Sequence, residues 1–332
     1  MSDPPPPSGH TRLRQRALTD TRGLTSPGAA PIQSALTSVT RQQLRGPGFL
    51  SLLRGVRMRA PTGPVRFEDR CRAALLALPD ACLDRLAAAV LWRLPVDPPD
   101  RISLTRAADA GASERPELLV RRADLHADDR DVCRGLPVTA LARTWVDLGA
   151  VLDVVELVCV GDVVLRRLSA PAETAEADRC GDGEAAARST MSAAVGRARG
   201  RRGVATARAA LPLLDARSAS PGETRCRLLL HGAGFGALRH AVPIRDRAGG
   251  WIAEGDLADV TARVLVQYDG LIHLLGDPRQ RAGDIARDEL SRMAGWEVVV
   301  LTAHDLAHPS LAIHKVASAY ERAADRRRGR AA

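Results

Sequence analysis

The stretch that decides the fold is residues 251–270, which read WIAEGDLADVTARVLVQYDG. It contains two strand-like runs, of which the second, 262–268, is the more apolar. Asp256 lies at the end of the first run, and Gln267 and Asp269 lie at the end of the second. Because residues two apart on a strand point to the same face, Gln267 and Asp269 share a face. The stretch therefore predicts neighbouring strands whose ends carry a group of polar side chains.

Helix and strand patterns continue on both sides of this stretch. A helix begins at Ser220, whose hydroxyl is followed three residues later by Glu223, a spacing typical of a capped helix start. The helix extends to His231, with strands at 239–244, 251–257, 262–268 and 297–302 and further helices at 277–294 and 309–325. The order helix, three strands, helix, strand, helix predicts a mixed α/β domain.

Carboxylates at the ends of neighbouring strands are suited to metal-dependent chemistry on nucleic acid. Phosphodiester cleavage uses a divalent metal to activate water and to neutralise charge in the transition state. Mg²⁺ prefers oxygen ligands, most often carboxylates. Asp256 and Asp269 offer such ligands, whereas Gln267 offers an amide oxygen without negative charge.

Residues spread over 220–301 carry a resemblance to a known family. They are Glu223, Asp256-Leu257, Gln267-Tyr268-Asp269-Gly270, His273, Asp284, Arg287 and Gly295-Trp296. Together they resemble a bacterial family of domains that are related to the very-short-patch-repair endonuclease. That family shares the restriction-endonuclease fold, so the resemblance implies a restriction-endonuclease-like α/β domain.

The resemblance also implies a set of site residues. Glu223, Asp256 and Asp269 are the implied ligands for Mg²⁺ or Mn²⁺, and the implied catalytic set adds Gln267 and His273. Gln267 stands where the family has a glutamate that is its central metal ligand. Because an amide holds Mg²⁺ less well than a carboxylate does, the resemblance implies a DNA endonuclease whose activity is reduced or lost.

Each of these residues also has a structural alternative. Glu223 can cap its helix by reaching back to the backbone of Ser220. Asp256 and Asp269 lie next to turns, where aspartate commonly forms local hydrogen bonds. His273 is equally compatible with a loop histidine.

Three neighbouring features are interpreted in the same way. Asp284 and Arg287 favour an ion pair on a helix surface over a phosphate contact. His304 and His308 have the spacing of metal ligands on a helix, but without a third ligand we interpret them as a chance pair. Glu254 shares its strand parity with the first site aspartate, so it offers partial compensation for the missing negative charge.

The N-terminal half is predicted to be mostly helical with a small sheet. Its motifs are Leu44-Arg45-Gly46-Pro47, Gly55-Val56, Leu91-Trp92, Gly135-Leu136-Pro137-Val138-Thr139 and Ala142-Arg143-Thr144-Trp145-Val146-Asp147-Leu148. These motifs look like those of the AbiEi-type antitoxin family, which is often fused to the nuclease-like domain. The resemblance implies a winged-helix-like start, a transcriptional or antitoxin role, and a cognate toxin as a partner. For Arg143 and Asp147, an ion pair on the helix surface or between domains is the favoured interpretation.

The elements predicted for this half are short. Helices are expected at 70–78, 81–94, 139–148 and 151–167, and strands at 101–104 and 118–121. The segment 32–59 is expected to form a helix, a turn and a short strand.

Positive charge is abundant and almost entirely due to arginine. The formal net charge is +9, and Lys315 is the one lysine among 48 basic residues. A GC-rich genome explains the preference for arginine over lysine, but not the net excess, which favours nucleic acid, with DNA as the expected partner. The arginines predicted to contact phosphates are Arg197, Arg199, Arg201, Arg202 and Arg208.

Composition divides the chain into six segments. They are a disordered basic arm (1–31), an AbiEi-like domain (32–168), a linker (169–189), a basic connecting helix (190–217), a restriction-endonuclease-like domain (218–325) and a basic tail (326–332). The six cysteines are scattered without zinc-binding spacing, so reduced thiols are expected. No signal peptide or uninterrupted apolar run is present, which predicts a cytoplasmic protein without a membrane partner.

Two functional hypotheses follow from the sequence. The first is a metal-dependent DNA endonuclease, a hydrolase with reduced or lost activity. The alternative is a non-catalytic DNA-binding or antitoxin-like regulatory protein, which predicts salt-sensitive DNA binding without a metal requirement. A degenerate gene product without a nucleic-acid role is a third interpretation, favoured by Gln267.

Overall fold

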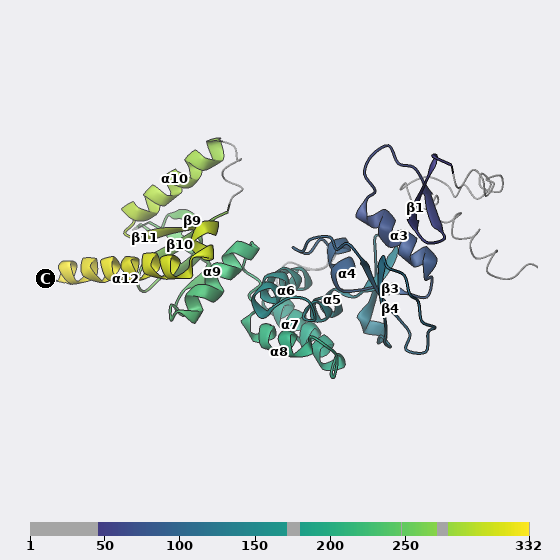
Figure 1. Cartoon of the computed structure of the whole chain (residues 1–332). Coiled ribbons are helices and arrows are strands. Elements are labelled where there is room, and N and C mark those ends of the chain that lie inside the picture. Colours follow the sequence, from purple (N-terminus) through teal and green to yellow (C-terminus); the bar gives the residue numbers. More distant parts are fainter. Residues whose placement is uncertain (1–45, 171–179, 247, 271–277, 332) are drawn as a thin grey trace, which may run out of the picture. The chain divides into compact units, whose positions relative to one another are not determined.

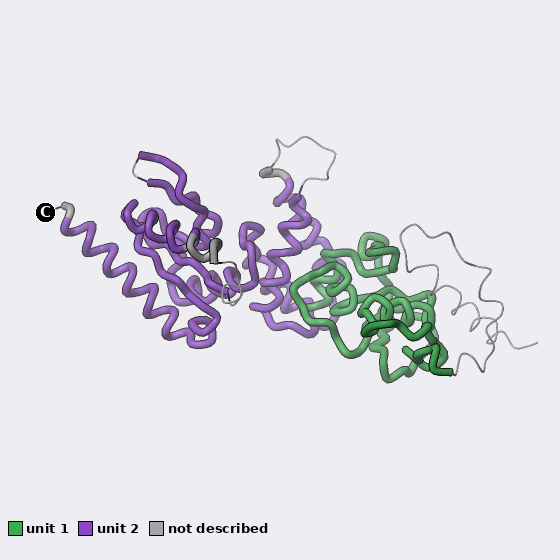
Figure 2. The backbone as a smooth tube through the Cα atoms, turned by 90° about the horizontal axis from the view of Figure 1, so that it is seen from above, with its two compact units in different colours: residues 1–148 green, residues 149–332 purple. Residues whose placement is uncertain are grey.

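The structure is a computed structural model that describes residues 46–170, 180–246, 248–270 and 278–331. The chain divides into two compact units, Met1–Leu148 and Gly149–Ala332 (Figure 2). Helices and strands occur in both units, which confirms the predicted mixed α/β class. The predicted basic arm, residues 1–31, lies outside the described residues.

The first unit is built on a five-stranded sheet with the strand order β5-β4-β3-β7-β6. Its elements are β1 (Phe49–Leu53), β2 (Val56–Arg59), α3 (Phe67–Ala77), β3 (Cys82–Leu83), α4 (Arg85–Leu91), β4 (Ile102–Arg106), β5 (Leu118–Arg122), η1 (Ala127–Asp129), β6 (Arg130–Cys133), β7 (Leu136–Thr139) and α5 (Leu141–Leu148). Strands β1 and β2 form a separate antiparallel hairpin. The core of the unit includes Leu83, Leu104 and Val138 from three neighbouring strands, all fully buried.

The sheet of the first unit is larger than the small sheet that the sequence predicts. Residues 81–94 have a helical pattern, but β3 takes the start of this segment and α4 begins only at Arg85, because pairing with β4 and β7 overrides local preference. Arg134 and Gly135 form a two-residue hairpin turn between β6 and β7. Both have the positive φ of a type I′ turn, 53° for Arg134 and 75° for Gly135.

A buried ion network joins the sheet of the first unit to α5; we use this name for Asp84, Arg121, Asp129, Arg143 and Asp147. Arg143 is 1% exposed and donates to Asp129 at 2.9 Å and to Asp147 at 3.1 Å. Arg121 donates to Asp84 at 2.6 Å and also to Asp147. The predicted ion pair of Arg143 and Asp147 is formed, but its predicted place on a helix surface or between domains is wrong, because both side chains are buried and all members of the network belong to the first unit.

The second unit begins with three packed helices, α6 (Val154–Ser169), α7 (Cys180–Arg197) and α8 (Val204–Ala210), and a short turn of 3₁₀ helix, η2 (Leu211–Leu213). Helix α6 packs against α7, α8 and α9 (Pro221–Gly232), so it belongs to this unit and not to an N-terminal domain that ends at residue 168. Its Asp162 accepts hydrogen bonds from Thr224 at 2.8 Å and from Arg227 at 3.1 Å, both on α9. These contacts attach the three helices to the sheet domain that begins with α9.

The predicted linker and connecting helix are divided differently in the structure. Helix α7 begins at Cys180, inside the segment 169–189, and the basic segment 190–217 is not one continuous helix. A turn with positive φ at Gly200 and Gly203 separates α7 from α8. A Cβ on Gly203 would lie 2.2 Å from the backbone nitrogen of Ala150, so only glycine permits this close approach.

The remainder of the second unit is built on a four-stranded sheet with the order β11-β10-β9-β8 (Figure 1). Besides α9, its elements are β8 (Arg239–Arg245), β9 (Trp251–Asp259), β10 (Val264–Asp269), α10 (Pro278–Met293), β11 (Glu297–Thr302), α11 (Ala303–Ala307) and α12 (Pro309–Ala331). Strands β10 and β11 are parallel, and the other pairs are antiparallel. The element order predicted from the sequence is confirmed.

Two apolar clusters cover the two faces of this sheet. On one face, Val264 and Val266 pack with Leu230 of α9 and Val316 of α12. On the other face, Leu265 packs with Ala294 and Trp296, which lie between α10 and β11. Because side chains alternate along β10, the polar residues at its end lie on both faces of the sheet. None of the helices in the described ranges combines the length and apolar character needed to cross a membrane.

Candidate functional site

The candidate site lies where β9 and β10 stop pairing. Their backbone register covers three residue pairs and ends at Leu257↔Val266. At the next position side chains replace the backbone ladder. Oδ2 of Asp256 accepts the N–H of Tyr268 at 2.7 Å, and Oε1 of Gln267 accepts the N–H of Asp256 at 3.2 Å. We call this arrangement of Asp256, Gln267 and Tyr268 the strand junction.

The backbone of Asp256 is held by side chains from both neighbouring strands. On the β8 side, Nδ1 of the buried His240 lies 2.8 Å from the carbonyl oxygen of Asp256. In a regular antiparallel ladder, the N–H and C=O of one residue bond the same partner residue. Ala253 and Ala258 pack in one cluster although five positions separate them, so the alternation of β9 shifts between them. The ladder is therefore interrupted at Asp256.

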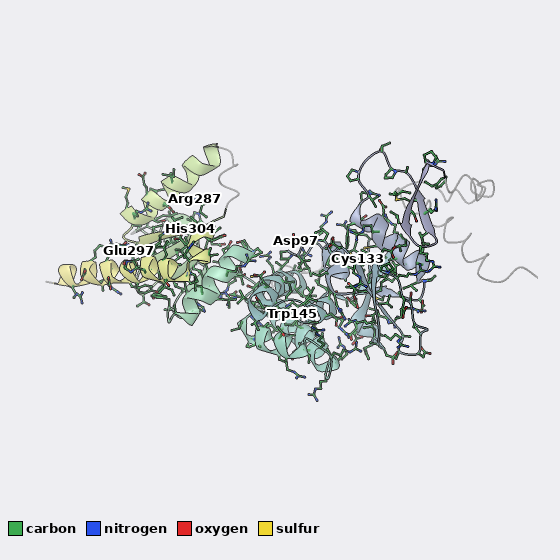
Figure 3. All side chains as sticks on the ribbon, viewed as in Figure 1. Asp97, Cys133, Trp145, Arg287, Glu297 and His304 are labelled. Atoms are coloured by element: carbon green, nitrogen blue, oxygen red, sulfur yellow. The ribbon has the colours of Figure 1, made fainter. Side chains whose placement is uncertain are left out.

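The electrostatic surroundings of Asp256 are predominantly acidic. The pKa of its carboxyl group is raised to about 6, chiefly by burial, and the negative charges of Glu223 and Asp288 act in the same direction. The Tyr268 N–H and the positive charge of Arg287, labelled on α10 in Figure 3, act in the opposite direction. Groups on α9 and α10 thus act on the same strand residue.

Glu223 forms the cap of α9 that its sequence position predicts. Its N–H donates to the hydroxyl of Ser220 at 3.2 Å, and that hydroxyl donates back to Oε1 at 2.8 Å. The second carboxylate oxygen accepts the N–H of Ala219 at 2.8 Å, so the carboxylate reaches one residue beyond the backbone group expected. The adjacent Gly222 lies against Tyr268, where an added Cβ would fall 2.0 Å from the ring. This contact places the start of α9 next to the strand junction.

The metal set implied by the resemblance is not formed by these residues. Among the described residues, no three His, Cys, Asp or Glu side chains are grouped so that they could hold a metal ion. Glu223, Asp256 and Gln267 direct oxygen atoms at protein donors, and Asp269 is exposed at the end of β10. Their arrangement does not fit Mg²⁺ or Mn²⁺, which require several oxygen ligands around one point.

Several other candidate residues have local roles or cannot be placed. His273 lies outside the described residues, and the side chain of Asp284 is not described. His304 and His308 stack at 4.2 Å between ring centroids, and Nδ1 of His308 lies 2.8 Å from the carbonyl oxygen of His304. Glu254 is exposed, and the shifted alternation of β9 removes the argument that placed it on the same face as the site.

The predicted phosphate-binding arginines surround the turn between α7 and α8. Arg199, Arg202 and Arg208 are exposed, whereas Arg197 and Arg201 are half-buried. No acidic residue occurs in the sequence from 197 to 208. The structure thus groups these arginines on a turn and a short helix.

Sequence reasoning missed two contributors to the strand junction. His240 contributes through its ring, and burial lowers the pKa of this ring to about 4, so it is neutral near pH 7. Tyr268 contributes through its backbone N–H, which no side-chain pattern reveals. The one available signal was a histidine within an apolar strand, where a buried polar ring requires a hydrogen-bond partner.

Comparisons with known proteins find similarity over only part of this chain. No family model matches it, and no solved structure does. Two curated proteins of Mycobacterium tuberculosis match, each named as an uncharacterized protein, from strains CDC 1551 / Oshkosh and H37Rv. Each is 31% identical over 145 residues, which are 43% of this chain and 52% of the relative. The chain thus spans about half the length of the curated relatives it matches.

Proposed function

We propose that this protein binds DNA through its second unit and that the nuclease-like domain of this unit does not cleave it. The observation that carries the proposal is the strand junction. Asp256 and Gln267 join two strands by directing at backbone N–H groups the oxygen atoms that a metal site would use as ligands. The helix and strand order of residues 221–331 is compatible with a restriction-endonuclease-like domain and supports this ancestry.

Charge supports the DNA-binding part of the proposal. The net charge of +9 favours a polyanionic partner. Arg199, Arg202 and Arg208 are exposed around one turn and have no acidic neighbour in the sequence between them. Exposed guanidinium groups bind phosphates through paired hydrogen bonds, and their binding releases counterions from DNA.

One observation favours metal-dependent DNA cleavage as a second candidate function. The negative charges of Glu223 on α9 and Asp288 on α10 both raise the pKa of Asp256, so two helices place like charge near the strand junction. A divalent cation is a common means of relieving such repulsion. This candidate requires the side chains at the junction to turn away from the bonds they make in the structure.

Cleavage assays separate the two candidates. Supercoiled plasmid, single-stranded DNA and mismatched duplex are incubated with the wild type, Gln267→Glu and Asp256→Ala, in Mg²⁺ or Mn²⁺. The proposal expects no cleavage by the wild type. Cleavage by the wild type that is lost in Asp256→Ala overturns it in favour of the endonuclease. Cleavage by Gln267→Glu alone supports both the nuclease ancestry and the loss of activity.

The DNA-binding role is tested by the salt dependence of binding to a duplex oligonucleotide in EDTA. Each phosphate contact contributes a slope of about −0.9 in a plot of log K against log salt concentration. Replacing Arg199, Arg202 and Arg208 together by glutamine is expected to reduce the slope by roughly 3. The matched control replaces the same three residues by lysine and is expected to keep the slope. If the protein does not bind the duplex in EDTA even at low salt, this proposal is overturned.

A further inference from the structure

A cavity of about 620 Å³ opens beside β5, an edge strand of the first unit. Four arginines line it: Arg85, Arg101, Arg115 and Arg121. An apolar wall is supplied by Pro116, Leu119 and Val120. Small-molecule sites have volumes of about 300–1,000 Å³, so the cavity has room for a ligand of nucleotide size.

The positive charge in the lining of this cavity exceeds the negative charge. Arg121 belongs to the buried ion network, in which Asp84 and Asp147 neutralise its charge. Arg101 and Arg115 donate to backbone carbonyl groups, at 2.7 and 2.6 Å. Within the described part of the chain, Arg85, Arg101 and Arg115 form no salt bridge. Glu114 is the one acidic residue of the lining, so the cavity favours an anionic ligand.

Arg85 occupies its position at the expense of backbone strain. Its φ of 44° is left-handed, a conformation that glycine and asparagine adopt more readily than arginine does. Its Nε is buried and has no hydrogen-bond partner among the described residues. Strained backbone conformations cluster at active sites and ligand-binding sites, so the strain at Arg85 is the observation that points to a ligand here.

A neighbouring cavity of about 360 Å³ provides a contrast. It shares Arg101 and Pro116 with the larger cavity. Its charged lining balances two arginines against two acids, Arg70 and Arg101 against Asp100 and Glu117. Excess positive charge is therefore a property of the larger cavity and not of this whole surface.

We propose that the larger cavity binds a small phosphorylated ligand of nucleotide size. Arg85, Arg101 and Arg115 contact the phosphate groups, because guanidinium groups pair with phosphate oxygens in a fixed two-pronged geometry. Leu119 and Val120 contact an apolar or planar part of the ligand. This site lies entirely within the first unit, and the proposal does not depend on DNA binding by the second.

Calorimetric titration of the full-length protein tests the proposal with ADP, pyrophosphate and adenosine as probes. ADP and pyrophosphate are expected to bind, and adenosine is expected not to bind at about 1 mM. Arg85→Asn and Arg101→Gln are each expected to weaken ADP binding about ten- to a hundredfold, because each removes a charge-assisted hydrogen bond. Arg122→Gln is the matched control, since Arg122 is exposed on β5 but does not line the cavity.

Two variants keep this test independent of folding. Asparagine suits the left-handed backbone of residue 85. Arg85→Asn is therefore expected to keep the midpoint of thermal unfolding while its ADP binding is weakened. Arg101→Gln alters a side chain on normal backbone. The proposal is overturned if neither ADP nor pyrophosphate binds, if adenosine binds as well as ADP does, or if Arg122→Gln causes the same loss. It is also overturned if only a duplex oligonucleotide responds to Arg85→Asn.

Discussion

The buried ion network of the first unit and the strand junction of the second are both polar clusters inside a folded unit, but their charges are arranged in opposite ways. In the buried ion network, every carboxylate accepts a hydrogen bond from a guanidinium group. In the strand junction, Asp256 accepts a backbone N–H, and no salt bridge to it is formed within the described residues.

This difference separates a charge-matched structural cluster from one whose partly buried carboxylate has no salt-bridge partner among the described residues. Matched opposite charges hold elements together, and their removal leaves a buried charge without compensation. Burial raises the pKa of Asp256 at the strand junction and also that of Asp84 in the buried ion network, but Asp84 has Arg121 as a salt-bridge partner. Substitutions in the two clusters should therefore differ both in the size of their effects and in their dependence on pH.

The largest effect is expected from Arg143→Met. The change removes a guanidinium group that is bonded to both Asp129 and Asp147 and leaves both carboxylates buried. The expected loss is about 3–5 kcal/mol in the free energy of unfolding of the first unit. Urea unfolding followed by tryptophan fluorescence measures it, because Trp145 is fully buried in the same helix. Arg122→Gln, an exposed arginine of the same unit, is the control, and equal losses in the two variants would contradict the structural role.

The next effect is a change in pH dependence on Asp256→Asn. The pKa of Asp256 in the folded protein is raised from 3.8 to about 6, so the folded state holds this proton more tightly than the unfolded state does. Its contribution to stability is therefore present below about pH 4 and is lost as the pH rises to about 6. Asp256→Asn should remove a decline on the order of 2 kcal/mol across this range.

Unfolding at a series of pH values from about 4 to 7 measures this difference between the two proteins. Burial also raises the pKa of Asp162, in the same unit, to about 6, so it contributes a similar decline to both proteins and cancels in their comparison. Asp269→Asn is the matched control, because it replaces an exposed carboxylate at the end of the neighbouring strand. Parallel pH profiles for the wild type and Asp256→Asn would show that the junction carboxylate is not perturbed.

A smaller loss is expected from Gln267→Leu. The change leaves the N–H of Asp256 without its acceptor, which costs about 1–2 kcal/mol if the group stays buried. Gln267→Glu restores an acceptor and is expected to match the wild type in acid. In mildly alkaline solution it should be less stable, because two carboxylates then repel each other. Thermal unfolding at both ends of the pH range measures these differences, and a Gln267→Leu variant as stable as the wild type would mean that the junction is open in solution.

The sequence predicted the second unit better than the first. Strands β8, β9 and β10 are strand-like runs bounded by turns or polar residues, and α9 begins with a cap, so local patterns were sufficient. In the first unit, β3 consists of Cys82 and Leu83 only and is stabilised by pairing with β4 and β7, which are distant in the sequence. A pattern confined to a few residues cannot reveal such a pairing.

The candidate site was predictable as a set of residues but not as a geometry. Asp256 and Gln267 follow from their places at the ends of neighbouring strand-like runs, and both belong to the strand junction. The sequence could not reveal that β9 shifts its alternation between Ala253 and Ala258, which brings these side chains to backbone N–H groups. Nor could it place the arginines of the first-unit cavity together, because they come from elements that meet only in the folded chain.

The smallest effect is expected from Arg225→Gln, the exposed counterpart of Arg143→Met. Arg225 of α9 forms a two-pronged pair with Glu156 of α6, at 3.0 and 2.8 Å, and both side chains are 41% exposed. Water and salt screen such a pair, so the expected loss is below about 1 kcal/mol and declines further in high salt. Urea unfolding in low and high salt measures it. A loss as large as that of Arg143→Met would mean that charge pairing itself stabilises this protein, whereas a small loss assigns the effect at Arg143 to burial.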